Sequence, residues 1–365
     1  MIPFLDLKRQ YNNIKTEINN EILDTLASQM FILGEELKKF EKKVAEYLGV
    51  KYALGVASGT DALLLSLKAL DIKPGDKVAT SPFTFIATAE TIVEVGAIPV
   101  FVDIGQDFNI DPVKLEEVLK DNNIKAIIPV HLFGNPCNME KIMQLAEEYD
   151  CKVIEDCAQA IGSEINNKKV GSFGVGCFSF FPAKNLGCFG DGGLVTTNSD
   201  ETYKKLILLR NHGSSPEDKY SHLIIGKSSR LDTLQARILS IKLDHLDKWN
   251  ADRINNANFY IEKIEDKNIL PVIDTQGKHV FNQFTLRTKN RDKLKAFLER
   301  KDIPTMIYYP RPLHLQPCFK FLNHKEGDFP EAEAACKEVL SIPIFPELTL
   351  TEKEEIVKNI NEFGK

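Results

Sequence analysis

The chain has 365 residues, of which 43% are hydrophobic and 27% charged, and its formal net charge of −6 gives no reason to expect nucleic acid or an anionic membrane as a partner. No apolar run of about 18 residues and no signal-peptide pattern occurs, so we expect a cytoplasmic protein without membrane contact. The seven cysteines are scattered and lack metal-type spacing, which predicts reduced thiols and no metal site.

Residues 7–48 are predicted to be mostly helical, with a break at 31–34. From residue 51 to about residue 200, short β-rich runs alternate with amphipathic stretches. The predicted strands are 52–57, 77–80, 98–102, 126–130, 152–155, 177–180 and 194–197, and helices are predicted at 61–70, 84–95, 112–119 and 139–149. This alternation predicts an α/β fold, a mainly parallel sheet with helices on both faces, whose ligands bind beyond the carboxyl ends of the strands.

A long helical pattern at 231–259 then leads away from the sheet. After Pro271 we expect a strand at 283–287, a helix at 293–300, a strand at 306–309 and a terminal helix from Thr351. The pattern predicts a large α/β domain over 1–250, which includes the N-terminal helical segment, and a smaller α+β domain over 251–365.

The sequence CFSFFPAKNLGCFGDGG at 177–193 places Lys184 after an apolar strand and among small, glycine-rich residues. A lysine held at a strand end and left reachable can form a Schiff base with an aldehyde, because desolvation or a nearby cation lowers its pKa and exposes the nucleophilic amine. Ser179 and the surrounding glycines favour such a site. A solvated loop lysine is the other interpretation.

The strand at 52–57 ends in Ser58, Gly59 and Thr60, and an apolar helix follows. Ser58 suits a helix N-cap, and Gly59 lets the backbone approach a ligand closely. Free N–H groups at the helix start then favour a phosphate. Ordinary helix capping explains the same pattern.

Asp156 follows the strand at 152–155, and Gln159 lies three residues further on. A carboxylate in this position can pair with a buried cationic ring nitrogen and make the ring a better electron sink, while Gln159 can donate to a ring hydroxyl. A capping box at a helix start accounts for both residues equally well. Phe85, after the strand at 77–80, can stack on a flat ring or belong to the core.

Two later segments, Ser228 to Arg230 and Tyr308 to His314, are polar, aromatic and cationic. Either can bind an anion or a sugar, or form a solvated loop. A Schiff-base lysine, a phosphate cup, a carboxylate for a ring nitrogen and an aromatic lid are together the parts that pyridoxal 5′-phosphate needs.

Several motifs resemble the nucleotide-sugar aminotransferases of the DegT/DnrJ/EryC1/StrS family. They are SGTDAL at 58–63, SPFTFIATAE at 81–90, PVHLFGNP at 129–136, EDCAQAIG at 155–162, SFFPAKNLGCFGDGG at 179–193, NHG at 211–213, SSRLDTLQA at 228–236 and YYPRPLHLQP at 308–317. The resemblance extends over effectively the whole chain. It implies the fold of aspartate aminotransferase (fold type I) with pyridoxal 5′-phosphate as cofactor.

The resemblance also implies residue roles. Lys184 would form the internal aldimine and then act as the base that moves the proton between the substrate carbon and the cofactor. Asp156 would pair with the pyridine nitrogen, Gln159 with the ring hydroxyl, and Phe85 would stack on the ring. The phosphate would be held by Gly59, Thr60 and Ser179.

In this family the active site lies at a homodimer interface, and the neighbouring subunit usually supplies an asparagine to the phosphate. This chain has Ser228 at that position, which is shorter, and the adjacent Lys227 is a possible replacement. Tyr308 stands where relatives often have histidine. Residues that the resemblance suggests for substrate binding are Arg230, Tyr308, Tyr309, Arg311 and His314.

The implied reaction is ping-pong transamination from glutamate, which becomes 2-oxoglutarate, to a keto group on a nucleotide-linked sugar. The motifs HGSSPEDKYSH and SSRLDTLQA look closest to members that aminate C3 of a dTDP-3-keto-6-deoxyhexose or a UDP-3-keto-N-acetylglucosaminuronate. Amination at C4 is the alternative. Lys184 disfavours the family's dehydratase branch, which has histidine there, although a lyase such as a dehydratase or desulfurase is a further reading.

Overall fold

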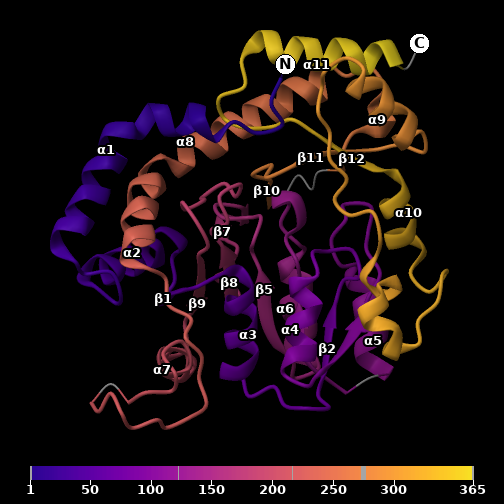
Figure 1. The fold of residues 1–365 in the computed structure, drawn as a ribbon. Helices are drawn as coiled ribbons and strands as arrows, with labels where there is room; N and C mark the ends of the chain where they lie inside the picture. Colours follow the sequence, from indigo (N-terminus) through magenta and orange to yellow (C-terminus); the bar gives the residue numbers. More distant parts are fainter. Residues whose placement is uncertain (1, 122, 216, 273–276, 364–365) are drawn as a thin grey trace.

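The main sheet of the computed structural model has seven strands in the order β1-β9-β8-β5-β4-β2-β3 (Figure 1). The structure describes all residues except 1, 122, 216, 273–276 and 364–365. The strands are β1 (Tyr52–Val56), β2 (Lys77–Thr80), β3 (Ile98–Phe101), β4 (Ile124–Ile128), β5 (Lys152–Asp156), β8 (Val175–Ser179) and β9 (Gly193–Thr197). Every predicted strand of the sheet therefore occurs, with its ends within two residues of the prediction.

Only β9 runs against its neighbours within this sheet, pairing antiparallel with both β1 and β8. The pairs β2–β3, β2–β4, β4–β5 and β5–β8 are all parallel. This confirms the mostly parallel α/β sheet that the sequence predicts. The segment between β8 and β9 carries Lys184, and the reversal brings the chain back past the carboxyl end of β8.

Helices cover both faces of the sheet because alternate strand residues point to opposite sides. Ile154 of β5 packs with one core, and its neighbour Val153 packs with the other. The first face is covered by α3 (Gly59–Ala69), α4 (Ala87–Glu94) and α7 (Asp200–Leu209). On the second face lie α2 (Glu35–Leu48), α5 (Pro112–Asp121), α6 (Met139–Glu148) and the first half of α8 (Thr233–Lys263).

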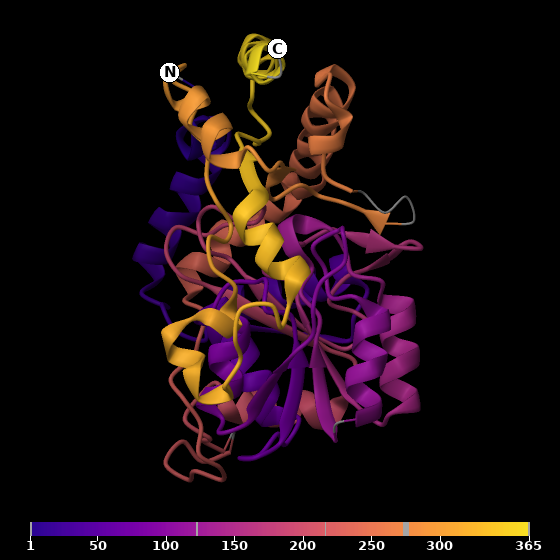
Figure 2. The same ribbon diagram turned by 90° about the vertical axis from the view of Figure 1, so that its right-hand side faces the viewer.

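The N-terminal helix α1 (Leu7–Ser28) and α2 are separated at the predicted break, and α1 packs on α8 through Ile14 and Ile18. In both views the two ends of the chain lie at the same end of the molecule (Figures 1 and 2). Among the helices described, none combines the length and apolar character that a bilayer crossing needs.

Helix α8 continues from the sheet region into a second core (Figure 1). There its residues Ala257 and Tyr260 pack against the C-terminal elements. These are β11 (Phe284–Arg287), α9 (Arg291–Glu299), β12 (Val339–Ile342) and α11 (Leu350–Phe363), while α10 (Pro330–Glu338) packs with Phe101 at the edge of the main sheet. The division into domains at residue 250 stays a prediction, and part of the predicted second domain, 273–276 and 364–365, lies outside the described residues.

The predicted strand at 306–309 is wrong. This segment makes a single bridge, from Met306 to Ser341, and β11 pairs with β12 instead. Proline at 304, 310 and 312 removes backbone donors around the segment, so it cannot continue a ladder.

The remaining elements are short. Strands β6 (Glu164–Ile165), β7 (Lys168–Lys169) and β10 (Gly277–Lys278) form a separate three-stranded sheet. Four 3₁₀ turns are described, η1 (Leu132–Gly134), η2 (Lys267–Ile269), η3 (Leu313–Leu315) and η4 (Pro317–Leu322).

Candidate active site

A cavity of about 400 Å³ opens at the carboxyl ends of β1, β5 and β8. This is the edge at which ligands bind in parallel α/β sheets. Nine of the residues proposed from the sequence line it, namely Gly59, Thr60, Phe85, Asp156, Gln159, Ser179, Lys184, Tyr308 and Tyr309. The fold thus collects residues separated by as much as 250 positions into one pocket.

Lys184 is half-buried in a tight loop after β8, and its own backbone N–H donates to the carbonyl of Phe181 over 2.9 Å. Gly187 permits this loop, since a Cβ there would lie 2.3 Å from the carbonyl oxygen of Pro182. Burial lowers the pKa of the Lys184 amine to about 8, and the negative charge of Asp156 opposes that shift. The neutral, nucleophilic fraction near neutral pH is therefore larger than that of an ordinary lysine.

Asp156, at the end of β5, is 5% exposed and is held by two hydrogen bonds. The hydroxyl of Thr88 donates to its Oδ2 over 2.8 Å, and the backbone N–H of Ala158 donates to its Oδ1 over 3.2 Å. Burial raises the pKa of Asp156, while these two donors and the charge of Lys184 lower it. A second cation in the cavity would further favour the ionised carboxylate.

The amide of Gln159 has a fixed orientation. Its Oε1 accepts from the backbone N–H of Phe133 over 2.6 Å, so its Nε2 must face the other way and donates to the hydroxyl of Tyr309 over 3.3 Å. Burial raises the pKa of the Tyr309 phenol, which keeps it neutral. Gln159 thus offers N–H groups toward the cavity, as its predicted contact with a ring hydroxyl requires.

The predicted phosphate cup forms at the start of α3. Ser58 caps this helix, with its hydroxyl accepting from the backbone N–H of Asp61 over 3.0 Å. Gly59 lies so close to β8 that a Cβ would sit 2.7 Å from the Cβ of Ser179. Free N–H groups, the positive end of the helix dipole and the Ser179 hydroxyl therefore converge on one wall of the cavity.

Phe85 is 55% exposed, in contrast to Phe83, which is 1% exposed and belongs to the core. The Phe85 ring lies 6.2 Å from that of Tyr309, at the mouth of the same cavity. Its exposed face is available to a flat ligand ring, which is the role expected from the sequence.

Four proposed residues do not line the cavity of this chain, namely Ser228, Arg230, Arg311 and His314. Arg230 donates to the side chain of Ser228 over 2.8 Å and to that of Asn211 over 3.0 Å, away from the cavity. His314 is buried against Glu333 at 3.1 Å. Arg311 is exposed to solvent.

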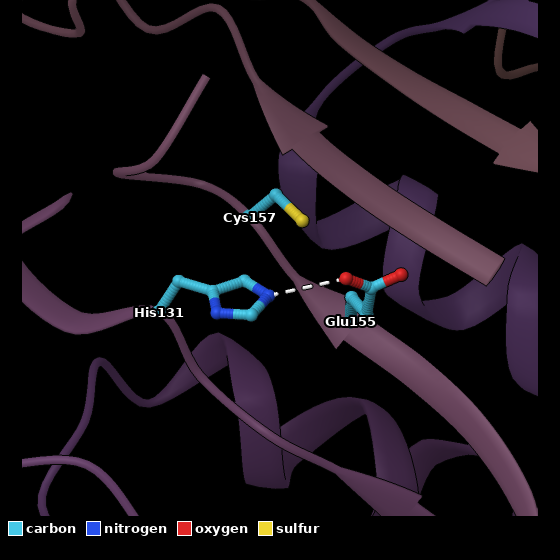
Figure 3. A group of neighbouring side chains, drawn as sticks. All are labelled: His131, Glu155 and Cys157. Atoms are coloured by element: carbon cyan, nitrogen blue, oxygen red, sulfur yellow. Dashed lines mark hydrogen bonds and ion pairs between the residues drawn. The ribbon is translucent and has the colours of Figure 1, made fainter. Parts of the chain in front are cut away.

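A buried group outside the cavity, made of His131, Glu155 and Cys157, brings together three potential metal ligands (Figure 3). His131 Nε2 lies 3.3 Å from Glu155, and its Nδ1 accepts from the backbone N–H of Cys137 over 3.0 Å. Glu155 also accepts three backbone N–H groups at 2.8 Å each, from Gly171, Phe173 and Gly174. These bonds account for the burial of His131 and Glu155 as a structural clamp on β5.

Sequence reasoning missed Thr88, Asn282 and Gln283. Asn282 and Gln283 line the cavity, and Thr88 holds Asp156. Thr88 lies within the motif SPFTFIATAE but looks like an ordinary helix residue, and its function depends on contact with a strand 68 positions away. Asn282 and Gln283 precede a short strand and carry no local signal.

Comparisons with known proteins agree with this geometry. Residues 12–361 match the model of the DegT/DnrJ/EryC1/StrS aminotransferase family. The chain is 46% identical to a "pleiotropic regulatory protein" of Geobacillus stearothermophilus, with 99% of this chain and 98% of that protein covered. It is also 46% identical to a UDP-N-acetyl-3-dehydro-alpha-D-glucosamine 3-aminotransferase of Acidithiobacillus ferrooxidans, with 95% of this chain and 94% of that protein covered.

A dTDP-3-amino-3,6-dideoxy-alpha-D-galactopyranose transaminase of Aneurinibacillus thermoaerophilus is 44% identical over the full length of both chains. Among solved structures, Streptomyces venezuelae DesV in complex with a ketimine intermediate superimposes with a TM-score of 0.96, at 39% identity, covering 100% of this chain and 98% of that one. With its motifs, fold and pocket in agreement, the chain belongs to the DegT/DnrJ/EryC1/StrS aminotransferase family.

Proposed function

We propose that this protein is a pyridoxal 5′-phosphate-dependent aminotransferase that converts a 3-keto group on a nucleotide-linked sugar into an amine, with glutamate as donor. The observation that carries the proposal is the placement of the Lys184 amine, with its lowered pKa of about 8, in one cavity with the buried Asp156 carboxylate and the start of α3. These three features supply a nucleophile, a partner for a ring cation and an anion cradle.

The cavity fits the cofactor in its chemistry. Gly59 leaves a cradle that a Cβ would fill, at a helix start whose backbone N–H groups suit an anion. When bound, pyridoxal 5′-phosphate supplies an aldehyde that carries the amino group and a ring that accepts electrons. Gly59, Thr60 and Ser179 would hold its phosphate, and Phe85 would cover one ring face.

Three further residues would control the protonation of the cofactor ring and of the reacting carbon. Asp156 would keep the ring nitrogen protonated, and Gln159 would donate to the ring hydroxyl. The Lys184 amine would hold and return the proton of the reacting carbon, since its lowered pKa suits a general base near neutral pH.

Amination at C3 is supported by the activities of two relatives, which form UDP-linked and dTDP-linked 3-amino sugars. The acceptor is therefore expected to be a UDP- or dTDP-linked 3-keto sugar. Amination at C4 is the alternative, which the same residues would also permit.

A desulfurase activity would need a reactive cysteine near the lysine. Cys188 is the nearest candidate in the lysine loop, but its thiol donates to the carbonyls of Phe180 and Gly190 at 3.0 and 3.1 Å. Burial raises the pKa of Cys188 to about 11, so it stays a protonated thiol near neutral pH. This favours the transaminase over the desulfurase.

The active form is proposed to be a cytoplasmic homodimer with shared sites. The loop that follows α7 extends below that helix (Figure 1), and its residues Leu223 and Ile225, which precede Ser228, are 60% and 88% exposed. Such apolar exposure is typical of a protein interface. In the dimer, this segment of one subunit would reach the phosphate cup of its partner, which accounts for the distance of Ser228 and Arg230 from their own cavity.

The function is tested by the visible absorbance of cofactor-loaded protein before and after glutamate, and then after a panel of 3-keto and 4-keto nucleotide sugars. We expect glutamate to bleach the band and one 3-keto sugar to restore it. Lys184→Ala should give no such band, and Lys184→Arg is its charge-preserving control. A band that glutamate leaves unchanged would refute glutamate as donor, and restoration by 4-keto sugars alone would establish the C4 alternative.

A further inference from the structure

Three buried asparagines from distant parts of the sequence are linked in series by hydrogen bonds beside the cavity. Asn250 lies on α8, Asn185 follows the lysine, and Asn282 precedes β11; they are 0%, 4% and 7% exposed. Asn185 Nδ2 donates to Asn250 Oδ1 over 2.8 Å, and Asn282 Nδ2 donates to Asn185 Oδ1 over 2.9 Å.

The donor-to-acceptor direction of these hydrogen bonds is fixed at Asn250, the asparagine at the far end from the cavity. Asn250 Nδ2 donates to the backbone carbonyl of Ile161 over 3.0 Å, so its oxygen must face Asn185. Asn185 Nδ2 also donates to the backbone carbonyl of Val280 over 3.1 Å. Both carbonyls can only accept hydrogen bonds. None of the three asparagine amides can therefore be flipped without placing two acceptors or two donors face to face. The last amide, Asn282, is thus forced to present its oxygen.

That oxygen has no hydrogen-bond partner among the described residues, although it is buried and its residue lines the cavity. The neighbouring Gln283 also lines the cavity, and its Oε1 is likewise buried without a described partner. A buried acceptor left without a donor is destabilising, because it has lost its hydrogen bonds to water without a replacement. Two such acceptors from consecutive residues indicate a ligand that brings donors to this wall.

We propose that Asn282 and Gln283 form an acceptor pair that binds hydrogen-bond donors of the sugar ring, its hydroxyl or amide N–H groups, and so determines which sugars enter. The assignment rests on the proposed function, which puts a sugar in this cavity. The cofactor's phosphate and ring oxygens accept hydrogen bonds and need the opposite kind of partner, whereas a sugar carries donors around its ring. Asn185 and Asn250 are positioning residues that hold the acceptor in place.

The test is calorimetric titration of the cofactor-loaded protein with two pairs of probes, UDP-N-acetylglucosamine against UDP and dTDP-glucose against dTDP. Asn282→Leu should weaken binding of at least one nucleotide sugar about 3- to 10-fold and leave its free nucleotide unchanged. Gln283→Met should show the same selective loss, and it keeps the test open if the first variant does not fold, since Gln283 is only half-buried.

The matched control is Asn256→Leu. Asn256 is a buried asparagine of α8 whose amide bonds the carbonyl of Phe345 over 2.8 Å, remote from the cavity lining. It should lose stability without selective loss of sugar binding.

The outcomes separate the assignment from the proposed function. Wild-type protein that binds neither nucleotide sugars nor nucleotides would overturn the proposed function together with this assignment. Normal wild-type binding with equal losses for sugar and nucleotide in the variants, or no loss, would overturn the acceptor pair alone. A shift of the pH titration of the cofactor absorbance in Asn282→Leu, without selective loss of sugar binding, would assign the acceptor to Lys184 and equally overturn the proposal.

Discussion

The hydroxyl of Thr88 donates a 2.8 Å hydrogen bond to the Oδ2 of Asp156, joining the first turn of α4 to the last residue of β5. Thr88 is fully buried, and its hydroxyl oxygen lies 3.0 Å from that of Thr84. The carboxylate that ends β5 is therefore oriented by α4, a helix that connects β2 to β3. The proposed pairing of Asp156 with the ring nitrogen of the cofactor depends on this contact.

We expect Thr88→Val to lower kcat/KM by about tenfold to a hundredfold, because a hydrogen bond to a charged group contributes about 1.5–3 kcal/mol. The Thr88 bond lowers the pKa of Asp156, so its loss raises that pKa and moves the acid limb of the pH profile to higher pH. Thr91→Val is the control, since the Thr91 hydroxyl bonds a backbone carbonyl of its own helix. Equal acid limbs in both variants would contradict the orientation of Asp156 by Thr88.

The strands of the main sheet could be predicted because each is a short apolar run bounded by turn residues. Prediction failed at 306–309, where Tyr308 and Tyr309 have strand propensity but line the cavity instead. Propensity reports the local preference of the backbone, whereas tertiary packing decided this segment.

Site residues could be predicted only where the neighbouring sequence indicates their function. Lys184 and Gly59 stand in glycine-rich strand ends, and Asp156 ends a strand. Asn282 carries no such signal, because its orientation comes from Asn185, 97 positions away. Similarly, nothing in the spacing of Phe83 and Phe85 distinguishes the core ring from the exposed one.

Gly59→Ala should weaken cofactor binding tenfold or more. The added Cβ would lie 2.7 Å from the Cβ of Ser179, so the start of α3 must move away from β8 and the phosphate N–H groups move with it. The dissociation constant is measured by titrating cofactor into cofactor-free protein. Gly105→Ala is the control, since its Cβ would meet a side-chain oxygen of Asp107 at 3.0 Å and the carbonyl oxygen of Asn109 only at 4.0 Å. Unchanged affinity in Gly59→Ala would remove α3 from the phosphate site.

Ile225→Asp should dissociate the proposed homodimer. Ile225 is 88% exposed in the single chain, and burying an isoleucine contributes about 1.5–3 kcal/mol, which is lost in both copies. Analytical ultracentrifugation should show the dimer dissociation constant raised by about a hundredfold or more. Val113→Asp is the control, as Val113 is also exposed, by 67%, on the unrelated helix α5. A wild-type monomer, or a variant that stays dimeric, would refute this interface.

We expect the buried Lys184 amine to destabilise the cofactor-free protein near neutral pH. Burial lowers the pKa of Lys184 to about 8 in the folded protein, compared with about 10.4 in an unfolded chain. Below pH 8 both states hold the proton, so the folded state bears the full penalty of a buried charge. The penalty declines as pH rises from 8 toward 10.4, because the folded protein then releases its proton before the unfolded chain does.

Lys184→Met should therefore stabilise the cofactor-free protein at pH 7, by about 1–3 kcal/mol after allowance for the partial exposure of the side chain, while it abolishes transamination. The gain should shrink when unfolding is measured near pH 10. Lys73→Met, at an exposed lysine, should change the free energy of unfolding by less than about 0.5 kcal/mol at either pH. If Lys184→Met gave no gain at pH 7, or the same gain at both values, the amine would titrate as an ordinary lysine. It would then lack the neutral fraction on which its proposed nucleophilic role depends.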